Sequence, residues 1–563
     1  MKVGIDFGTS TSEIAFVDKN GLTTVVPNSL GETVTPSVVY YSSDGHVVVG
    51  REAKEMALLD PDNAFLEVKR LFGQDRVLNA RGKDVAPPDV ASEIIKYLIN
   101  CAQAHTGETV DSAVITVPAY FTDAQRKDVV AAGIAAGIEV SRIINEPTAA
   151  SLDYGIDHMS ECQYILVYDL GGGTLDVTVL ELFEGVVDVK ASCGNNALGG
   201  KDFDQALIDH ITAAIKKKDK VDVTNDLRVQ IHIKAAAEAC KIALSENESY
   251  DIGLPFLYQD KHGNAAGYAE NITRTSFECM IKDKIVSTKK QIDQALFDAG
   301  LKAADIDIAL LVGGSTRIPF VSAWLEDAYG FLPESAVDPD LAVVKGAAIQ
   351  AGVLSGVLSE NAIVLTDVCP YSLSTKTLTH IGFNLKTHIC DVIIPRNTTL
   401  PAAASKIYQT AADDQTCVHV TAYQGESDDP DENELLNTFV LDGIPKGKAG
   451  RQKINISLAY DLNGILAVSG QIVSTGKSVR VEVDTGRLGK NLDLNTWKDV
   501  PASNVYRKII NRADRLSKVH GDDAANVVAA AIQLKKALIL GWESAIIADY
   551  ENDLHQAIKE LDR

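Results

Sequence analysis

The feature that most constrains this 563-residue chain is a strand–acid–glycine turn that occurs twice. Asp6-Phe-Gly-Thr-Ser10 follows the apolar stretch Val3–Ile5, and Asp169-Leu-Gly-Gly-Gly-Thr174 follows the apolar stretch Tyr164–Tyr168. In both places an acid at the strand end is followed by glycine and then by a hydroxyl residue. A duplicated device of this kind predicts two similar lobes that face each other.

Residues 1 to about 360 alternate short apolar strands with helical segments. Ala113–Val117 and Ala309–Val312 have the composition of further buried strands, whereas Lys127–Ala136 and Gln230–Leu244 have that of helices. Strands that alternate with helices predict an α/β domain.

The two glycine turns are suited to phosphate. Glycine lets the backbone approach a ligand closely, and successive amides and hydroxyls can surround phosphate oxygens. The candidate phosphate contacts are Gly8, Thr9, Ser10, Thr11, Gly171, Gly172, Gly173 and Thr174. Asp169 and Asp176 could hold Mg²⁺ through water. The alternative for each motif is an ordinary turn, which is easier to accept for the first than for the triple glycine.

Two further segments could reach the rest of a nucleotide. Leu311–Arg317 is a third glycine turn after a strand, in which Gly313 and Gly314 could contact the α-phosphate and ribose, and Arg317 could stack on adenine. A simple strand–helix connection is the alternative. Glu238, Lys241 and Ser245 share one helix face and could bind ribose and adenine. Taken alone, that face would be a solvated one.

The pattern changes near residue 362. From Cys369 to about residue 483 apolar residues alternate with polar ones, as in Val418–Ala422 and Ile454–Leu458, and Asp442-Gly443 is a turn signal between such runs. Alternation with a period of two residues predicts an antiparallel β-sandwich or partial barrel. The predicted segments are therefore 1–361, a linker over 362–368, a β-domain over 369–488 and a short helical, lid-like region over 489–563.

Composition excludes several classes of function. The net charge is −24, and the chain has no block of Lys and Arg, so nucleic acid is not expected as a partner. The eight cysteines are scattered, which favours free thiols in a reducing compartment. We find no secretory signal and no apolar run of about 18 residues, so we expect a cytoplasmic protein with no membrane span.

Long motifs, in order, resemble the seventy-kilodalton heat-shock chaperone family of DnaK type. The matching segments are Gly4–Thr9, Lys69–Leu71, Ile115–Phe121, Asp123–Arg126, Asn145–Ala150, Asp169–Asp176, Leu198–Asp204, Leu311–Pro319, Asn397–Pro401, Tyr423–Glu426, Phe439–Pro445 and Asn463–Leu466. The resemblance spans residues 1 to about 485. It implies an α/β, actin-like, two-lobed ATPase domain, a β-sandwich that binds peptide, and a short α-helical C-terminal region.

The resemblance also implies roles in ATP hydrolysis. Asp6 and Asp169 would position hydrated Mg²⁺, and K⁺ is a further candidate ion. Lys69 would stabilise charge on the γ-phosphate, which Thr174 would contact, and Glu146 and Asp176 would order water. Such positioning and neutralisation is what phosphoryl transfer requires. Gly199, Gly200 and Asp340 join the expected nucleotide contacts.

Two further sets of residues are implied. Pro118 and Arg126 would pass the nucleotide state to the linker residues Ile363, Val364, Leu365 and Asp367, whose apolar members must dock somewhere. In the β-domain Leu378, Tyr408, Ala411, Val418 and Val420 would bind an extended peptide, with Leu378 and Ala411 arching over it. Plain sandwich core is the alternative, most of all for Val420.

The chain departs from the family pattern near its C-terminus and its peptide site. A long lid and acidic tail are not recognisable, and Ser374 and Thr375 replace a glycine and an apolar residue. The linker Thr366–Pro370 and the short C-terminal region resemble the HscC branch.

We therefore expect an ATP-dependent chaperone that binds extended, unfolded polypeptides. A J-domain co-chaperone is the implied partner, and a nucleotide exchange factor is left open. An actin-fold small-molecule kinase and a filament-forming or scaffold relative are the alternatives, although neither needs residues after 361.

Overall fold

The computed structural model describes most of the chain and, by contact, divides it into two compact units. Undescribed residues are 75, 159–160, 184, 335–336, 360–363, 382–384, 462–465, 483–502, 504, 521–526, 528–529, 532–533, 536–537, 539–550, 552–553, 556, 560 and 562–563. One unit comprises Met1–Thr416 with Val420–Val483, and the other Cys417–His419 with Asp484–Arg563. The predicted four-segment division stays a prediction.

The first large sheet has the order β11-β10-β1-β2-β3, and β4 pairs with β2. β1, β10 and β11 are parallel, whereas β2 and β3 return antiparallel. Val3, Ile5 and Phe7 are fully buried, as their apolar spacing predicts. Its strands are β1 (Lys2–Phe7), β2 (Thr11–Val17), β3 (Thr23–Val25), β4 (Thr35–Pro36), β10 (Ser112–Val117) and β11 (Glu139–Asn145).

The second large sheet repeats that topology. Its order is β18-β17-β12-β13-β14-β19, in which β12, β17 and β18 are parallel and β13 and β14 return antiparallel. Asp6 lies opposite Glu13 in the first sheet, as Asp169 lies opposite Asp176 in the second. The internal repeat therefore extends from the turns to whole sheets. The strands are β12 (Cys162–Leu170), β13 (Leu175–Phe183), β14 (Val186–Asn195), β17 (Ile308–Val312), β18 (Pro333–Glu334) and β19 (Val364–Thr366).

Helices cover these sheets and join them. α10 packs against both α4 and β1, because Gly346 lies against the backbone of Ala149 and Gly4 against that of Ala348. A side chain at either glycine would collide with that backbone. The helices are α1 (Arg51–Met56), α2 (Pro87–Thr106), α3 (Asp123–Ala135), α4 (Glu146–Gly155), α5 (Gly200–Asp219), α6 (Leu227–Glu246), α7 (Arg274–Ser287), α8 (Lys289–Ala299), α9 (Pro319–Tyr329) and α10 (Ala342–Ser355).

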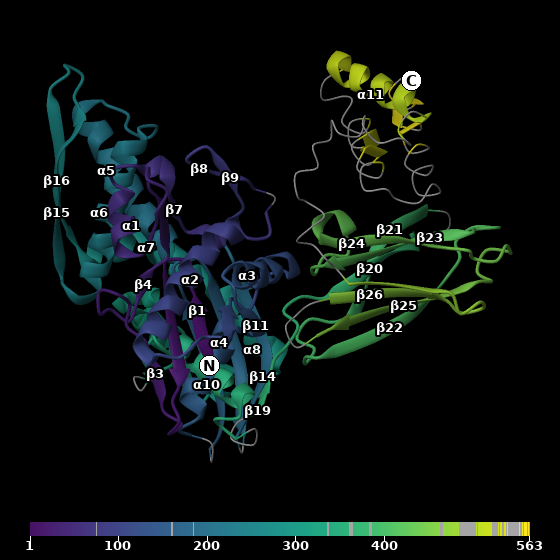
Figure 1. Ribbon diagram of the computed structural model, residues 1–563, viewed down its shortest axis with the longest axis horizontal. Coiled ribbons are helices and arrows are strands. Elements are labelled where there is room, and N and C mark those ends of the chain that lie inside the picture. The colour runs from purple at the N-terminus through teal and green to yellow at the C-terminus, as the bar shows by residue number, and fades with distance from the viewer. Residues whose placement is uncertain are drawn as a thin grey trace. The chain divides into compact units, whose positions relative to one another are not determined.

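Smaller elements flank the large sheets (Figure 1). The hairpin β15–β16 stands beside α5, α6 and α7. The small strands are β5 (Val38–Tyr41), β6 (Val47–Val49), β7 (Ala64–Leu66), β8 (Leu78–Ala80), β9 (Lys83–Val85), β15 (Ser249–Gln259) and β16 (Ala265–Thr273). The 3₁₀ helices are η1 (Pro61–Asn63), η2 (Val68–Leu71), η3 (Ala303–Asp305), η4 (Gly314–Arg317) and η5 (Pro430–Glu432).

The segment after residue 369 forms two four-stranded sheets, in the orders β21-β20-β23-β24 and β22-β25-β26-β27. They pack face to face, because Gly470 of β26 lies against Val420 and Leu441 of the other sheet. Antiparallel strands are what the period of two residues predicts, and the full β-sandwich domain stays a prediction. The strands are β20 (Leu373–Ile381), β21 (Leu385–Ile394), β22 (Ala402–Gln409), β23 (Cys417–Gln424), β24 (Glu434–Asp442), β25 (Lys453–Tyr460), β26 (Leu466–Ile472) and β27 (Ser478–Glu482).

The second unit contains α11 (Arg507–His520). Ile509, Ile510 and Ala513 of this helix belong to an apolar cluster with Leu534 and Leu554. Helical content is what the sequence predicts here. Among the helices that the structure describes, none combines the length and apolarity needed to cross a membrane.

Candidate functional site

The three predicted glycine turns meet in one pocket of about 80 Å³. Residues from both large sheets line it, together with Lys69 and Glu146. The lining residues are Asp6, Gly8, Thr9, Ser10, Thr11, Glu13, Lys69, Glu146, Asp169, Gly171, Gly172, Thr174, Val312, Gly313, Gly314, Pro339, Asp340 and Val343.

Backbone contacts hold the turns together. The amides of Gly200 and Lys201, at the start of α5, donate to the carbonyls of Gly171 and Gly172 at 2.9 Å each. Ser315 of the third turn donates its hydroxyl to the Gly171 carbonyl at 2.9 Å. A Cβ on Gly199 would lie 2.5 Å from the Gly173 nitrogen. Glycine is required at Gly199 because two backbones meet there.

Lys69 is buried rather than exposed, with 3% of its side chain accessible. It lies in η2, and its ammonium donates to the Phe7 carbonyl and to Glu146 Oε1, the latter at 2.6 Å. A buried lysine needs such partners to remain charged. The structure thus places a fixed positive charge beside the first predicted phosphate turn.

Carboxylates surround this lysine. Asp6 accepts a hydrogen bond from the Thr116 hydroxyl at 2.6 Å, and Asp176 Oδ2 accepts one from the Ala119 amide at 3.2 Å. Burial, together with the charge of Glu146, raises the pKa of Asp6 and of Asp176 to about 7. Burial also raises the pKa of Asp169.

This site fits a hydrated cation. Asp176 Oδ1 is buried and has no hydrogen-bond partner among the described residues. No three His, Cys, Asp or Glu side chains in the described part of the chain are grouped to bind a metal directly. Mg²⁺ keeps several of its waters in proteins, so carboxylates such as Asp6 and Asp169 could hold it through them.

The predicted face of α6 is partly buried. Glu238 forms an ion pair with Lys54 at 2.7 Å and lines a second pocket that shares Thr9 and Ser10 with the first. Lys241 pairs with Asp204 at 2.8 Å and donates to the Gly200 carbonyl at 3.2 Å. This face is therefore not a solvated one. Ser245, the third predicted member, donates to the Lys241 carbonyl in its own helix.

Arg317 lies at the rim of the third turn. Its guanidinium pairs with Asp340 at 2.6 Å and with Asp338 at 3.0 Å, and its side chain is 49% exposed. Asp340 itself lines the pocket beside Gly313 and Gly314. An exposed planar cation in this position could stack on a base.

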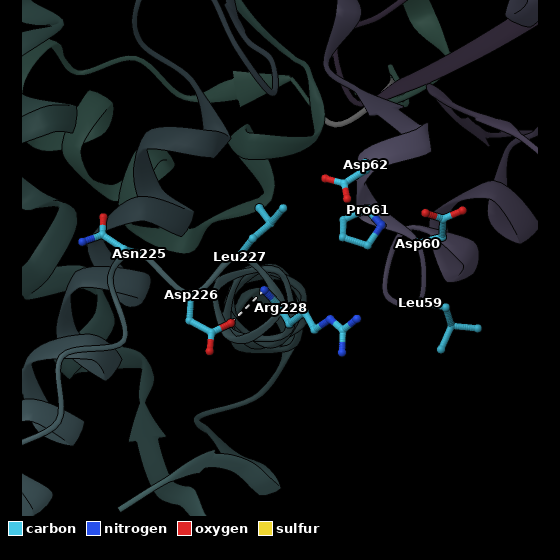
Figure 2. A pocket seen from close by; sticks show the side chains of 8 residues that line it. All are labelled: Leu59, Asp60, Pro61, Asp62, Asn225, Asp226, Leu227 and Arg228. Carbon is cyan, nitrogen blue, oxygen red and sulfur yellow. Dashed lines mark hydrogen bonds between the residues drawn. The ribbon is translucent and has the colours of Figure 1, made fainter. Parts of the chain in front are cut away.

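A larger pocket of about 520 Å³ lies elsewhere (Figure 2). Residues 59–62, around η1, form one side of it, and residues 225–228, at the start of α6, form the other. Its labelled side chains include the exposed Leu59 and Leu227, and it contains none of the glycine turns. The smaller pocket is the candidate nucleotide site, because the predicted phosphate-binding turns lie there.

The predicted coupling residues form a chain of hydrogen bonds. Arg126 donates to the Ala119 carbonyl at 3.0 Å and to Asn145 Oδ1 at 2.7 Å, and Asn145 Nδ2 donates to both carboxylate oxygens of Asp367 at 2.8 and 2.9 Å. Pro118 precedes this network and accepts from the Phe121 amide. The β-domain residue Tyr371 also donates to the Tyr120 carbonyl at 3.1 Å.

Part of the predicted linker adds a strand to the second large sheet. Val364–Thr366 pairs in parallel with β14, through Val364 with Val186 and Leu365 with Val187. Val364 remains 47% exposed. The predicted linker residue Ile363 lies outside the described residues.

The predicted peptide-site residues differ in exposure. Val420 is buried between the two β-sheets, whereas Leu378 is 43% exposed and Ala411 is exposed. Tyr408 is half-buried and donates its hydroxyl to Asp391 at 2.9 Å. Val418, which belongs to the second unit, is half-buried. The arch of Leu378 and Ala411 over a peptide stays a prediction.

Comparison with known proteins decides the family. A model of the family described as Hsp70 protein matches residues 2–77 and 74–561. The chain is 43% identical over 487 residues to the Chaperone protein DnaK of Thermotoga petrophila, covering 86% of this chain and 80% of that relative. Over 566 residues it is 38% identical to the protein of the same name from Thermosipho melanesiensis, covering 100% of this chain and 93% of that relative. The chain belongs to the Hsp70 family.

Membership of the Hsp70 family confirms the expected ATPase and the expected ATP-dependent chaperone. It also confirms ATP and ADP as ligands and a mixed α/β fold. A third relative, from Thermosipho africanus, is also named Chaperone protein DnaK and is 42% identical over 497 residues. The matched region covers 88% of this chain and 81% of that relative. DnaK is therefore a better-supported name than the HscC branch.

Several residues of this Hsp70 site were not found from the sequence. Glu13 is buried and lines the pocket, and burial beside Asp6 raises its pKa. Arg70 donates to the Gly173 carbonyl at 3.1 Å, and Lys201 lies 3.5 Å from Glu238. The alternation of side chains along the strand after the first turn could have identified Glu13 as a pocket residue, because Glu13 lies opposite Asp6 in the sheet. Arg70 and Lys201 meet partners distant in the chain, which no local pattern indicates.

Proposed function

We propose that this chain is a peptide-binding chaperone in which ATP binding and hydrolysis control peptide exchange. Residues 1–361 would form an actin-like, two-lobed ATPase domain, 362–368 the linker, 369–488 the β-sandwich and 489–563 a short helical lid. The observation that carries the proposal is the meeting of three glycine turns around the Lys69–Glu146 pair. The linker strand and the Asp367 contacts lie in the same compact unit.

In the proposed reaction the chain positions charge rather than forming a covalent bond. Thr9, Ser10 and Thr11 bind phosphate oxygens, and Thr174 contacts the γ-phosphate. Lys69, already held by Glu146 at 2.6 Å, neutralises charge that develops on that phosphate. Bound Mg²⁺ supplies Lewis-acid stabilisation of phosphate oxygens.

The remaining site residues orient water and the nucleoside. Asp6 and Asp169 would hold the cation through its waters, and Asp176, through its unpaired Oδ1, would orient the water that attacks the phosphate. Glu146 keeps Lys69 in place. Glu238, Lys241 and Ser245 face the ribose and adenine, and Gly313, Gly314, Arg317 and Asp340 close the other side. K⁺ is a further candidate ion.

Coupling rests on the linker as a two-state element. In one state, supported by the β14–β19 pairing, Val364 and Leu365 join the ATPase sheet and Asp367 accepts from Asn145. Freeing the β-domain would require release of these contacts and of those that Tyr371 and Arg396 make with Tyr120 and Asp298. Because Asn145 also binds Arg126, and Arg126 binds Ala119 beside Pro118, a change near Asp176 can reach the linker through adjacent bonded groups.

The proposed client is an extended, unfolded polypeptide bound in the β-domain by Leu378, Tyr408, Ala411, Val418 and Val420. A J-domain partner and a cytoplasmic location go with this proposal, and an exchange factor is left open. The linker sequence Thr366–Pro370 supports assignment to the HscC branch, whereas the names of the similar relatives support assignment to DnaK.

ATP turnover with and without an unfolded peptide tests the function. We expect peptide to stimulate phosphate release, and we expect peptide to exchange faster with ATP bound than with ADP bound. Transfer of the γ-phosphate to a sugar, or turnover that ignores peptide, would contradict the proposal.

A further inference from the structure

A buried lysine beside the candidate nucleotide pocket has no close ionic partner. Lys201 lies in the first turn of α5, and its side chain is 10% exposed. Its ammonium lies 3.5 Å from a carboxylate oxygen of Glu238 and 3.8 Å from oxygens of Glu67 and Asp204. These distances exceed the roughly 2.7–2.9 Å of a charge-assisted hydrogen bond, so Lys201 is held loosely.

Each of those three carboxylates has another lysine closer to it. The closer pairs are Glu67 with Lys234 of α6, Glu238 with Lys54 of α1 at 2.7 Å, and Asp204 with Lys241 of α6 at 2.8 Å. Four ammonium groups therefore share three carboxylates. Arg70, which also lies near Glu67, pairs with Asp202 at 3.5 Å and leaves this excess of positive charge unchanged.

Lys201 stays charged despite its burial. Burial lowers the pKa of Lys201, but the charges of Glu238, Glu67 and Asp204 outweigh it and raise the pKa above the ordinary value for lysine. A buried cation is unfavourable unless an anion compensates for its lost hydration. The network thus contains a charged ammonium to which the described residues supply no close anion of its own.

The position of Lys201 indicates which anion it would take. Its amide donates to the Gly172 carbonyl at 2.9 Å, so its backbone is fixed to the second glycine turn. Its side chain lines a pocket of about 40 Å³ together with Thr9 and Ser10 of the first turn. Thr9 and Ser10 also line the candidate nucleotide pocket, which contains Lys69. A phosphate bound to these two hydroxyls would border both pockets.

The two pockets have opposite excess charge. In the candidate nucleotide pocket the carboxylates outnumber Lys69, whereas three lysines outnumber Glu67 and Glu238 in the pocket of Lys201. A nucleotide polyphosphate with its Mg²⁺ has both signs of charge: the hydrated cation suits the carboxylates, and the phosphate oxygens suit the lysines. An ammonium on a flexible stem can turn to such an oxygen without movement of the backbone.

We infer that Lys201 is a further nucleotide-binding residue, whose ammonium contacts the phosphate chain of ATP or ADP at Thr9 and Ser10. The inference rests on the proposed function, because it takes Thr9 and Ser10 as phosphate contacts. In the ligand-free chain the three carboxylates keep the ammonium beside the turn, and the nucleotide supplies the anion that the network lacks. Lys201 then contributes affinity for the phosphates rather than for the nucleoside.

Ligands with and without phosphate test this assignment. The full chain is titrated with ADP and Mg²⁺, and separately with adenosine, by isothermal calorimetry at one ionic strength. The variants are Lys201→Gln, which keeps a polar side chain but removes the charge, and Lys201→Arg, which keeps the charge. The matched control is Lys216→Gln, at an exposed lysine of the same helix that pairs with Asp222.

We expect Lys201→Gln to weaken ADP binding roughly tenfold to a hundredfold, the usual effect of one hydrogen bond between charged groups. Adenosine affinity should stay the same, since adenosine has no phosphate. Lys201→Arg should keep most of the affinity for ADP, and Lys216→Gln should bind both ligands like wild type. A lysine that only held α6 in place would affect ADP and adenosine alike.

A second variant tests the charge balance with the opposite sign. Glu67→Gln removes one of the three carboxylates and none of the lysines, so ADP should bind several-fold more tightly while adenosine affinity stays the same. This variant keeps Lys201, so it can refute the inference even if Lys201→Gln does not fold. ADP affinity that does not rise in Glu67→Gln would show that the excess charge does not act on the phosphates.

The remaining outcomes separate the inference from the proposed function. Unchanged ADP affinity in Lys201→Gln, or equal losses for ADP and adenosine, would overturn the inference, and ATP turnover stimulated by peptide would still support the proposed function. If wild type binds neither ADP nor ATP, the proposed function fails and the inference fails with it.

Discussion

The nucleotide pocket and the β-domain interior both bury polar groups without full partners, but the groups differ in kind. Among the described residues that line the pocket, the carboxylates of Asp6, Glu13, Glu146 and Asp169 outnumber the one cation, Lys69. In the β-domain the unpaired groups are neutral and include the Thr375 hydroxyl and Gln424 Oε1. Excess buried negative charge demands a cation, whereas an unpaired neutral group demands no ion. The unsatisfied groups of the nucleotide pocket thus indicate the chemistry of its ligand.

The largest expected effect comes from removing the single lysine of the pocket. Lys69→Ala should retain nucleotide binding, since the glycine turns remain, but lose about 10²- to 10³-fold in single-turnover ATP hydrolysis, the usual effect of removing one group that stabilises transition-state charge. Lys96→Ala, which removes a surface lysine paired with Glu93, is the matched control. Hydrolysis at the wild-type rate in Lys69→Ala would remove this residue from the mechanism.

Next in size is the connection between the two regions. Val364→Asp with Leu365→Asp should abolish stimulation of the ATPase by peptide, because charged side chains disfavour the strand that pairs with β14. Basal and peptide-stimulated turnover are measured side by side. Val357→Asp, at an exposed apolar residue upstream, should keep the stimulation. Stimulation that survives the double substitution would show that this strand does not transmit the signal.

The two regions should respond differently to pH. Asp6 and Asp176 have pKa values raised from 3.8 to about 7, so the folded chain binds their protons more tightly than the unfolded chain. Their proton uptake raises the free energy of unfolding of the ligand-free chain. This contribution is fully present below about pH 4 and is lost as the pH rises through 7.

Binding of Mg²⁺ with ADP needs the ionised carboxylates, so the affinity for this ligand should increase with pH, whereas the stability contribution decreases. Affinity should be roughly tenfold weaker at pH 6 than at pH 8 if one group with a pKa of about 7 must lose its proton. Calorimetry in buffers of different ionisation heat measures the released protons, and Asp6→Asn removes the contribution of Asp6, so that the pH dependence that remains belongs to Asp176, Asp169 and the nucleotide. The affinity of the β-domain for an uncharged peptide should be flat over this range, since Leu378, Ala411 and Val420 have no group that titrates. Peptide affinity that follows pH would break the comparison.

The smallest expected effect concerns one amide in the coupling network. Asn145→Ala removes both hydrogen bonds to Asp367 and the acceptor of Arg126. Peptide stimulation should fall a few-fold while nucleotide affinity changes little, because Asn145 is absent from the pocket lining. Nucleotide titration and stimulated turnover in the same preparation separate these effects. A large loss of nucleotide affinity would instead assign Asn145 to the pocket.

The sequence alone determined the parts of this protein whose chemistry is local. The paired turns at Asp6 and Asp169, the strands around them and the alternating β-strands after residue 369 can each be recognised from neighbouring residues. Their physical causes act over a few residues: a strand period of two, and a glycine that lets the backbone approach a ligand.

Tertiary structure decided which side chains are buried and which partners they have. Lys69 became a buried cation because Phe7 and Glu146 enclose it, and the α6 face became part of a cleft because Lys54 and Asp204 meet it from other elements. Thr375 has an ordinary strand sequence around it, and only the packing of the β-domain leaves its hydroxyl buried without a partner. Such properties depend on contacts between residues far apart in the chain, which no local pattern contains.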